Sequence, residues 1–302
     1  MKSYKTISAF ILAVALIFCL TMAYSCKEKR SQTGERIIVS IAPLKYIVEA
    51  ITCGDFNIDI LLPEGASPET YSPTPKQIAG LENSLFLFTT GLIDFENELI
   101  SKVDKSLISK GNRIISLSKG ITLLSGTCSH SHIEGHSHSH GIDPHVWTSP
   151  KQLKIMALNA YNAISNAYPD SVKYAIAYRQ LDEEIEALSE WAAVTLKVSG
   201  VDKFIIYHPA LTYYANDYGL EQIAVENEGK EPSAVHMKSI IDEARNAGIT
   251  SVMYQKEFPR SVVELVAREL DADIIEINPL AEDIVSELRL ITNVITSNHQ
   301  KQ

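Results

Sequence analysis

The chain has 302 residues, enough for two domains or for one large domain with a substantial core. Apolar residues make up 45% of it and charged residues 21%, which excludes a disordered, collagen-like or coiled-coil protein. The 37 acidic residues outnumber the 27 basic ones, so the formal charge of −10 argues against nucleic acid as a partner and favours a cationic ligand.

Residues 1–25 have the pattern of an export signal. Two lysines precede an apolar run over residues 7–23, and a small residue, Ser25, stands just before Cys26. A membrane-anchor helix is the alternative, but polar residues interrupt this run and it is shorter than the roughly 20 apolar residues that span a bilayer. The junction resembles a bacterial lipoprotein processing site, although Ala23 stands where that pattern usually has Leu. We expect cleavage before Cys26 and a lipid on its thiol that anchors the protein to a membrane.

A tether is predicted over residues 26–35, because no apolar side chain occurs from residue 27 to residue 35. Removing the signal takes away two lysines and no acidic residue, which leaves a formal charge of −12. Apart from the anchor cysteine, the exported part keeps only Cys53 and Cys128, too few for a disulfide scaffold. These two thiols either pair in an oxidising compartment or stay free.

Short β-branched runs then alternate with longer periodic ones, which predicts a mostly parallel sheet covered by helices. The predicted strands of this first series are residues 37–41, 57–62, 85–89 and 114–117. The predicted helices between them are residues 43–52, 76–83 and 95–103.

Two helices follow, over residues 150–167 and residues 171–198, and the second has no internal Gly or Pro. A second α/β series has predicted strands at residues 204–207, 222–225, 251–254 and 273–277, and predicted helices at residues 210–217, 233–246 and 260–270. We therefore predict three parts: an N-terminal α/β lobe over 36–168, a rigid linker helix over 169–199 and a C-terminal α/β lobe over 200–302. A long helix between lobes allows less hinge motion than strand or loop crossovers do.

A histidine-rich loop over residues 129–140 interrupts the end of the first lobe. Five of the nine histidines fall within eleven residues, namely His130, His132, His136, His138 and His140. Imidazole binds zinc, copper and nickel well, but a loop rich in Gly and Ser cannot impose one geometry on an ion. The loop is therefore interpreted as a low-affinity metal collector, with a solvated polar insertion as the alternative.

His145 differs in kind from these loop histidines. It lies in the segment Asp143-Pro144-His145-Val146-Trp147, just ahead of a predicted helix and beside a bulky Trp. Packing can hold such a ring in one orientation, which suits a metal ligand. A buried histidine with a structural hydrogen bond is the alternative, because local spacing defines no second ligand.

The segment from Asp143 to Pro150 after a His-rich loop resembles the solute-binding proteins of zinc and manganese ABC importers, the zinc-uptake or cluster A-I family. Residues 61–75, residues 207–214 and residues 231–234 resemble further segments of that family in the same order. The resemblance covers residues 36–298. It implies two α/β lobes with a metal cleft between them, and an extracytoplasmic protein that delivers its ion to a membrane permease.

The resemblance also implies a ligand set, carried over position by position. His145 and His208 match the second and third ligands, whereas Glu69 stands where the family has His and Asn278 stands where it often has Asp. Glu oxygen makes the shell harder than an all-imidazole set, which admits manganese or iron, but zinc remains the preferred ion. Two alternatives stay open: Glu69 as a solvated loop carboxylate, and Asn278 as a turn residue before Pro279.

Other polar residues are weaker candidates. Glu226 and Glu228 are expected to be solvated surface groups, and His236 and His299 are not expected to bind metal. Tyr213 and Tyr214 are expected to pack near the cleft.

A zinc-dependent hydrolase is one alternative function, because Glu276 together with the three proposed N and O ligands provides enough metal-binding side chains. The chain has no His-Glu-x-x-His or Gly-x-Ser-x-Gly motif, so no enzymatic activity is expected. A metal-binding adhesin or a metal-buffering lipoprotein is the other alternative, and both are compatible with the same fold.

Overall fold

The computed structural model describes residues 34–103, 113–126, 141–226 and 232–297, which all belong to one compact unit beginning at Gly34. The predicted signal over 1–25, the lipid-bearing Cys26 and the His-rich loop over 129–140 lie outside the described residues. No helix in the described part of the chain is both long and apolar enough to cross a membrane.

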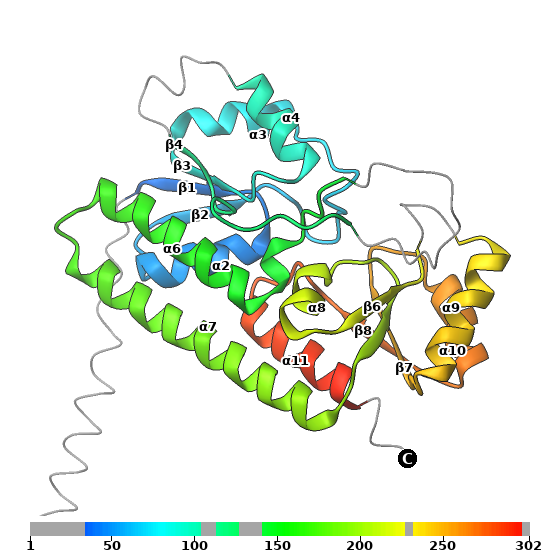
Figure 1. The fold of residues 1–302 in the computed structure, drawn as a ribbon. Helices are drawn as coiled ribbons and strands as arrows, with labels where there is room; N and C mark the ends of the chain where they lie inside the picture. The colour runs from blue at the N-terminus through cyan, green and yellow to red at the C-terminus, as the bar shows by residue number, and fades with distance from the viewer. Residues whose placement is uncertain (1–33, 104–112, 127–140, 227–231, 298–302) are drawn as a thin grey trace, which may run out of the picture. The chain divides into compact units, whose positions relative to one another are not determined.

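The N-terminal sheet is parallel, with the strand order β2-β1-β3-β4 (Figure 1). Its strands are β1 (Arg36–Val39), β2 (Asn57–Ile60), β3 (Ser84–Thr89) and β4 (Arg113–Ser116). The helices of this lobe are α2 (Ala42–Thr52), α3 (Pro75–Gly80) and α4 (Asp94–Lys102), with a 3₁₀ turn at Leu81–Asn83. The two central strands are the most buried, as expected for a sheet covered on both faces.

The C-terminal sheet repeats this topology, with the order β6-β5-β7-β8 and parallel pairing throughout. Its strands are β5 (Lys203–Ile206), β6 (Glu221–Ala224), β7 (Ser251–Gln255) and β8 (Asp273–Ile277). Its helices are α8 (Thr212–Tyr218), α9 (Ala234–Asn246) and α10 (Arg260–Leu270). In both sheets the first strand of the series therefore lies inside and the second strand lies at the edge.

Two long helices connect the sheets: α6 (Pro150–Ala167) and α7 (Val172–Ser199). The 28 residues of α7 span about 42 Å. Ser171 caps its start by accepting from the backbone N–H of Tyr174, and Gly200 ends it with a left-handed φ of 71°. The predicted α/β fold with two parallel sheets and a long connecting helix is confirmed.

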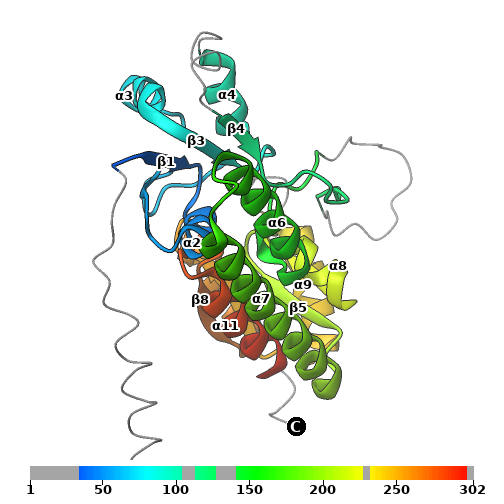
Figure 2. The ribbon, with the colours of Figure 1, turned by 90° about the vertical axis from the view of Figure 1, so that its left-hand side faces the viewer.

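Sequence analysis missed the last helix, α11 (Ile284–Ser297). Ile284, Leu288, Ile291 and Ile295 recur at helical spacing and are fully buried. Their face packs on α7, which also packs on α2 and α6, as Figures 1 and 2 show. The same helix α7 is therefore in contact with helices of both lobes.

The hydrophobic core follows from this arrangement. One cluster of buried side chains runs from the first sheet through α6 and α7 to α11 and includes Phe204 and Ile206 of β5. The intervening Ile205 belongs to a second cluster under α9 and α10. Successive side chains of β5 thus point to opposite faces of its sheet. The first of the two clusters extends through both lobes as one continuous core.

Candidate metal centre

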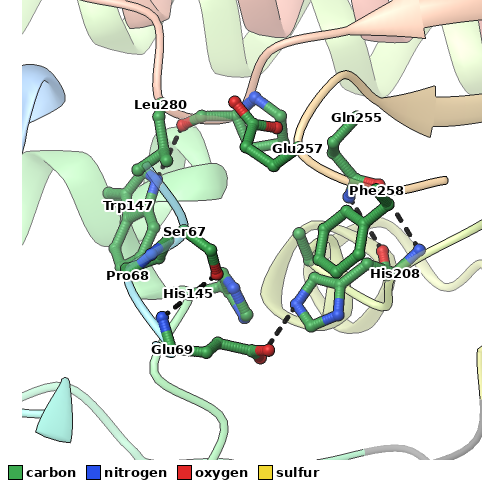
Figure 3. Close-up of a pocket in the computed structure, with 12 residues that line it drawn as sticks. Ser67, Pro68, Glu69, His145, Trp147, His208, Gln255, Glu257, Phe258 and Leu280 are labelled. Atoms are coloured by element: carbon green, nitrogen blue, oxygen red, sulfur yellow. Dashed lines mark hydrogen bonds and ion pairs between the residues drawn. The ribbon is translucent and has the colours of Figure 1, made fainter. Parts of the chain in front are cut away.

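A cavity of about 30 Å³ lies where the loops at the carboxyl ends of the strands meet (Figure 3). Three of the four predicted ligands line it: Glu69, His145 and His208. Glu69 comes from the loop after β2, His145 from the segment before α6, and His208 from the turn after β5. Carboxyl ends of parallel strands are the usual place for ligand sites in α/β folds, and this one gathers residues from both lobes.

His145 is held by Asp143, two residues before it. One carboxylate oxygen of Asp143 accepts from ring Nδ1 of His145 at 2.9 Å and from its backbone N–H at 2.8 Å. Burial alone would raise the pKa of Asp143, but the hydrogen bonds and charge of His145 outweigh it and hold that pKa below its usual value. Trp147 packs against the ring with centroids 5.2 Å apart. Because Nδ1 donates to the carboxylate, Nε2 of His145 keeps a free lone pair.

His208 is oriented in the same way by the carboxylate of Glu226, which follows strand β6. Its Nδ1 donates to Oε2 of Glu226 at 2.9 Å, and its Nε2 lies 3.3 Å from Oε1 of Glu69. Burial alone would lower the pKa of His208, but the hydrogen bond to Glu226 and the charges of Glu69, Glu226 and Asp143 together raise it. The rings of His208 and His145 have centroids 5.1 Å apart. Both histidine rings line the same small cavity.

The backbone of His208 is also clamped. The side chain of Gln255 accepts from the N–H of His208 at 3.3 Å and donates to its carbonyl at 2.9 Å. Phe258 stacks on the imidazole, with centroids 4.8 Å apart and planes 16° from parallel (Figure 3). Both contacts come from β7 and the loop after it. Together with Glu226 they fix the backbone of His208, one face of its ring and its Nδ1 atom.

The prediction that Glu226 is a solvated surface group is wrong. Glu226 is only 7% exposed, and its carboxylate pairs with the ring of His208. Glu69, His208 and Glu226 each offer an atom within 4.8 Å of the others, a grouping that could hold a metal. Because Nδ1 of His208 already donates to Glu226, we assign Glu226 a supporting position behind the ring. Its place directly after the buried strand β6 was the signal that would have identified it; Glu228 lies outside the described residues.

Glu69 faces His208, although its side chain is 41% exposed. Its backbone N–H donates to Ser67 Oγ at 3.3 Å, and a capping box of Thr74 and Gln77 starts α3 just beyond the loop. Gln77 also donates to the carbonyl of Leu61 at 2.7 Å, which ties the end of the loop back to its beginning. The loop is therefore anchored at both ends while the carboxylate reaches the cavity.

The structure does not bring Asn278 to these three residues. Its Oδ1 accepts from the backbone N–H of Leu280 at 3.1 Å, and its own N–H donates to Glu287 at 2.7 Å. Asn278 lines a neighbouring cavity of about 300 Å³ instead. Its side-chain oxygen thus caps its own turn.

Direct hydrogen bonds join the two lobes beside the cavity. Trp147 Nε1 donates to the carbonyl of Pro279 at 2.8 Å, and Thr148 Oγ1 donates to the carbonyl of Ala210 at 2.9 Å. The hydroxyl of Tyr213 donates to the carbonyl of Asp143 at 2.9 Å, in keeping with its predicted packing role. These bonds fix the segment around His145 against the C-terminal lobe.

The remaining predicted residues lie elsewhere. Tyr214 is buried and its hydroxyl bonds to Thr292 at 2.6 Å, while Glu276 accepts from Tyr254 at 2.8 Å. His236 lies in the first turn of α9 and does not line the cavity. His299, Cys128 and the loop histidines His130, His132, His136, His138 and His140 lie outside the described residues.

The three gathered side chains suit a divalent transition metal. Two imidazole nitrogens and one carboxylate oxygen are a borderline set that binds zinc and also accepts manganese or iron. Each ring is backed by a carboxylate, which fixes the tautomer and increases the basicity of the ligating nitrogen. A cavity of about 30 Å³ is far smaller than the usual pocket for an organic ligand.

Comparison with known proteins agrees with this geometry. The family model described as "Zinc-uptake complex component A periplasmic" (ZnuA) matches residues 37–296. The high-affinity zinc uptake system protein ZnuA of Bacillus subtilis is 26% identical over 285 residues, which cover 89% of this chain and 88% of that protein.

The zinc-binding lipoprotein AdcA of Streptococcus pneumoniae is 24% identical over 291 residues, covering 91% of this chain but 55% of that protein. The chain thus spans about half the length of its AdcA relatives. A solved structure of a ZnuA deletion mutant with zinc bound is 31% identical, with a TM-score of 0.78, and covers 89% of this chain and 99% of that one.

Proposed function

Because the chain belongs to the ZnuA family of periplasmic zinc-uptake components, we propose that it captures a divalent transition metal outside the cytoplasm and delivers it to the permease of an ABC importer. Zinc is the proposed cargo, ahead of manganese or iron. The names of the relatives, a zinc uptake protein and a zinc-binding lipoprotein, support this choice.

One observation carries the proposal: two buried histidine rings, each backed by a carboxylate, face the carboxylate of a loop across a cavity of about 30 Å³. We assign His145, His208 and Glu69 as direct ligands of the ion, with Asp143 and Glu226 behind the rings. Neutral imidazoles bind through Nε2 while the supporting carboxylates compensate part of the positive charge of the ion.

The size of the cavity supports a carrier over a hydrolase. A hydrolytic metal site needs an open coordination position, a water and space for an organic substrate. About 30 Å³ accommodates an ion or a water but not a peptide or ester. The site therefore suits an ion that is bound, held and released unchanged.

The proposal includes attachment to a membrane through a lipid on Cys26 and a His-rich loop over 129–140 that collects ions at low affinity. One acyl chain binds a membrane only weakly, so stable attachment requires the several chains that lipoprotein processing adds. The lipid would keep the protein at the membrane that holds the permease, and the loop would raise the local concentration of the ion.

Calorimetric titration of the purified protein with zinc tests the function, followed by uptake in cells that carry or lack the partner permease. We expect one tight site in the parent, its loss in His208→Ala, and zinc uptake that depends on both the protein and the permease. Tight binding without any dependence of uptake on the protein would leave an adhesin or a metal buffer as the function.

A further inference from the structure

Glu257 is a fourth ionisable residue on the wall of the small cavity. It stands two residues after the end of β7 and lines the same space as Glu69, His145 and His208. Figure 3 shows it on the opposite side of the cavity from Glu69. Sequence analysis did not single it out, because nothing in the local sequence around it resembles a ligand motif.

The position of Glu257 is set by its neighbours in the chain. Gln255 clamps the backbone of His208 through two hydrogen bonds, and Phe258 stacks on the ring of the same histidine. Glu257 lies between these two contacts, so its backbone is held beside a proposed ligand. Glu257 therefore lines the cavity from a fixed backbone position, and its side chain is free to rotate about its own bonds.

The carboxylate of Glu257 has no hydrogen bond or ion pair with any residue that the structure describes. An anion that is removed from water without a partner is costly, so this group needs solvent or a cation. Glu257 also borders the neighbouring cavity of about 300 Å³, which is large enough for water. The larger cavity would allow water to reach the carboxylate, and an ion in the small cavity would give it a positive partner.

We infer that Glu257 is the fourth ligand of the ion, supplying from the loop after β7 the carboxylate that Asn278 does not supply after β8. This inference rests on the proposed function of the site. The side chain of Asn278 is engaged in its own turn and lines only the larger cavity, whereas Glu257 borders both.

A fourth ligand gives the site two nitrogens and two oxygens. Four-coordinate geometry is what zinc adopts in closed protein sites, and three protein ligands alone leave a position to water. The second carboxylate also makes the shell harder, so the site discriminates less strongly against manganese than an imidazole-rich site does. Glu257 thus contributes both to how tightly the ion is held and to which metal the site prefers.

The test is calorimetric titration of the purified protein with zinc, using Glu257→Gln and a matched control. Gln keeps the shape of the side chain and removes its charge. The control is Glu282→Gln, because Glu282 lines only the larger cavity and pairs with Lys45 at 2.8 Å. We expect Glu257→Gln to weaken zinc binding by about 10- to 100-fold or more, and Glu282→Gln to change it by less than about threefold.

X-ray absorption of bound zinc gives a second readout, in which Glu257→Gln should change the coordination shell and Glu282→Gln should not. The His208→Ala variant distinguishes a failure of the inference about Glu257 from a failure of the proposed function. If His208→Ala abolishes tight binding while Glu257→Gln binds as the parent does with an unchanged shell, the inference is overturned and the proposed function stands. If both variants bind zinc as tightly as the parent, the proposed function fails, and the inference fails with it.

Discussion

Nε2 of His208 lies 3.3 Å from Oε1 of Glu69, so a strand-end histidine of the C-terminal lobe meets a loop carboxylate of the N-terminal lobe. In an ion-free protein this contact is an ion pair when the ring carries a proton on Nε2 as well as on Nδ1. A divalent ion placed between the two atoms would replace it with two coordinate bonds. The pair therefore keeps the ligands close together before the ion arrives, which lowers the entropy cost of assembling the site.

Glu69 should decide both affinity and metal preference. Glu69→Ala removes a ligand and an anion next to the ion, so zinc affinity should fall by more than about tenfold. Glu69→His should retain binding and shift preference from manganese towards zinc, because imidazole suits zinc better than carboxylate does.

Calorimetry of the loop-deleted protein with each metal checks the effect of Glu69. Glu64→Ala is the matched control, because Glu64 lies in the same loop but its side chain is 93% exposed. If Glu69→Ala binds as tightly as Glu64→Ala, Glu69 is only a loop carboxylate.

As the pH is lowered, zinc affinity should begin to decrease at a higher pH than it does for a site with ordinary histidines. The pKa of His208 is raised above its usual value of 6.5, and a proton on Nε2 excludes the ion. Protons therefore begin to compete above pH 6.5, and affinity decreases as the pH falls through the raised pKa. Glu226→Gln removes a cause of the upward shift, so the pH dependence should move to lower pH.

The same substitution should also reduce zinc affinity by about 10- to 100-fold in alkaline solution, because the ring loses the charged partner on Nδ1. Titrations across this range in two buffers of different ionisation enthalpy measure both the affinity and the number of protons released. An unchanged pH profile in Glu226→Gln would contradict the assigned support of His208.

Trp147 should stabilise the protein as well as the site. Its ring is fully buried and its Nε1 donates to the carbonyl of Pro279 in the other lobe. Trp147→Phe leaves that carbonyl without its donor, which should lower the free energy of unfolding by about 1–3 kcal/mol, with a further loss from reduced packing. Denaturant unfolding compared with Trp191→Phe, whose partly buried ring contacts Arg289, provides the control. Equal losses in both variants would show that the hydrogen bond between lobes adds nothing.

The His-rich loop should increase the number of zinc ions that each chain binds, but it should not form the tight site. Deleting residues 129–140 should lower the number of zinc ions bound per chain while one tight site remains. Metal analysis of untagged protein, with and without the deletion, measures this difference. Loss of the tight site after deletion would mean that the principal ligands lie in the loop and not in the cavity.

The lipid on Cys26 should determine where the protein resides. Cys26→Ser removes the thiol that would carry it, so the protein should leave the membrane fraction or stay unprocessed. Mass spectrometry and fractionation of cells provide the readout. An unchanged mass and an unchanged membrane fraction would rule out lipidation at this residue.

Hydrophobic periodicity predicted most of the fold because the apolar pattern of each segment agrees with the strand or helix that it forms. Short, fully apolar and β-branched runs such as Ile37–Val39 are typical of buried strands in a sheet covered on both faces. The last helix, α11, was missed even though Ile284, Leu288 and Ile291 carry a helical pattern.

The candidate site was only partly predictable because its support comes from pairing between strands. Glu226 looks like a loop residue in the sequence, and only the pairing of β5 with β6 brings it beside His208. Likewise, Glu257 reaches the cavity through the position of β7 next to β5. Asn278 matched a ligand position in the chain, yet its side chain is committed to a local turn.

Helix α7 contacts α2 and α6 of the N-terminal lobe and α11 of the C-terminal lobe, so a wide separation of the lobes would expose apolar side chains of a shared core. We therefore expect loading and release to involve local rearrangement of the side chains of Glu69 and Glu257 and of the two loops that carry them. The scattering profiles of empty and loaded protein should then be nearly identical. A permease that selects the loaded form must recognise changes in the surface around these two loops, and not a change in the angle between the lobes.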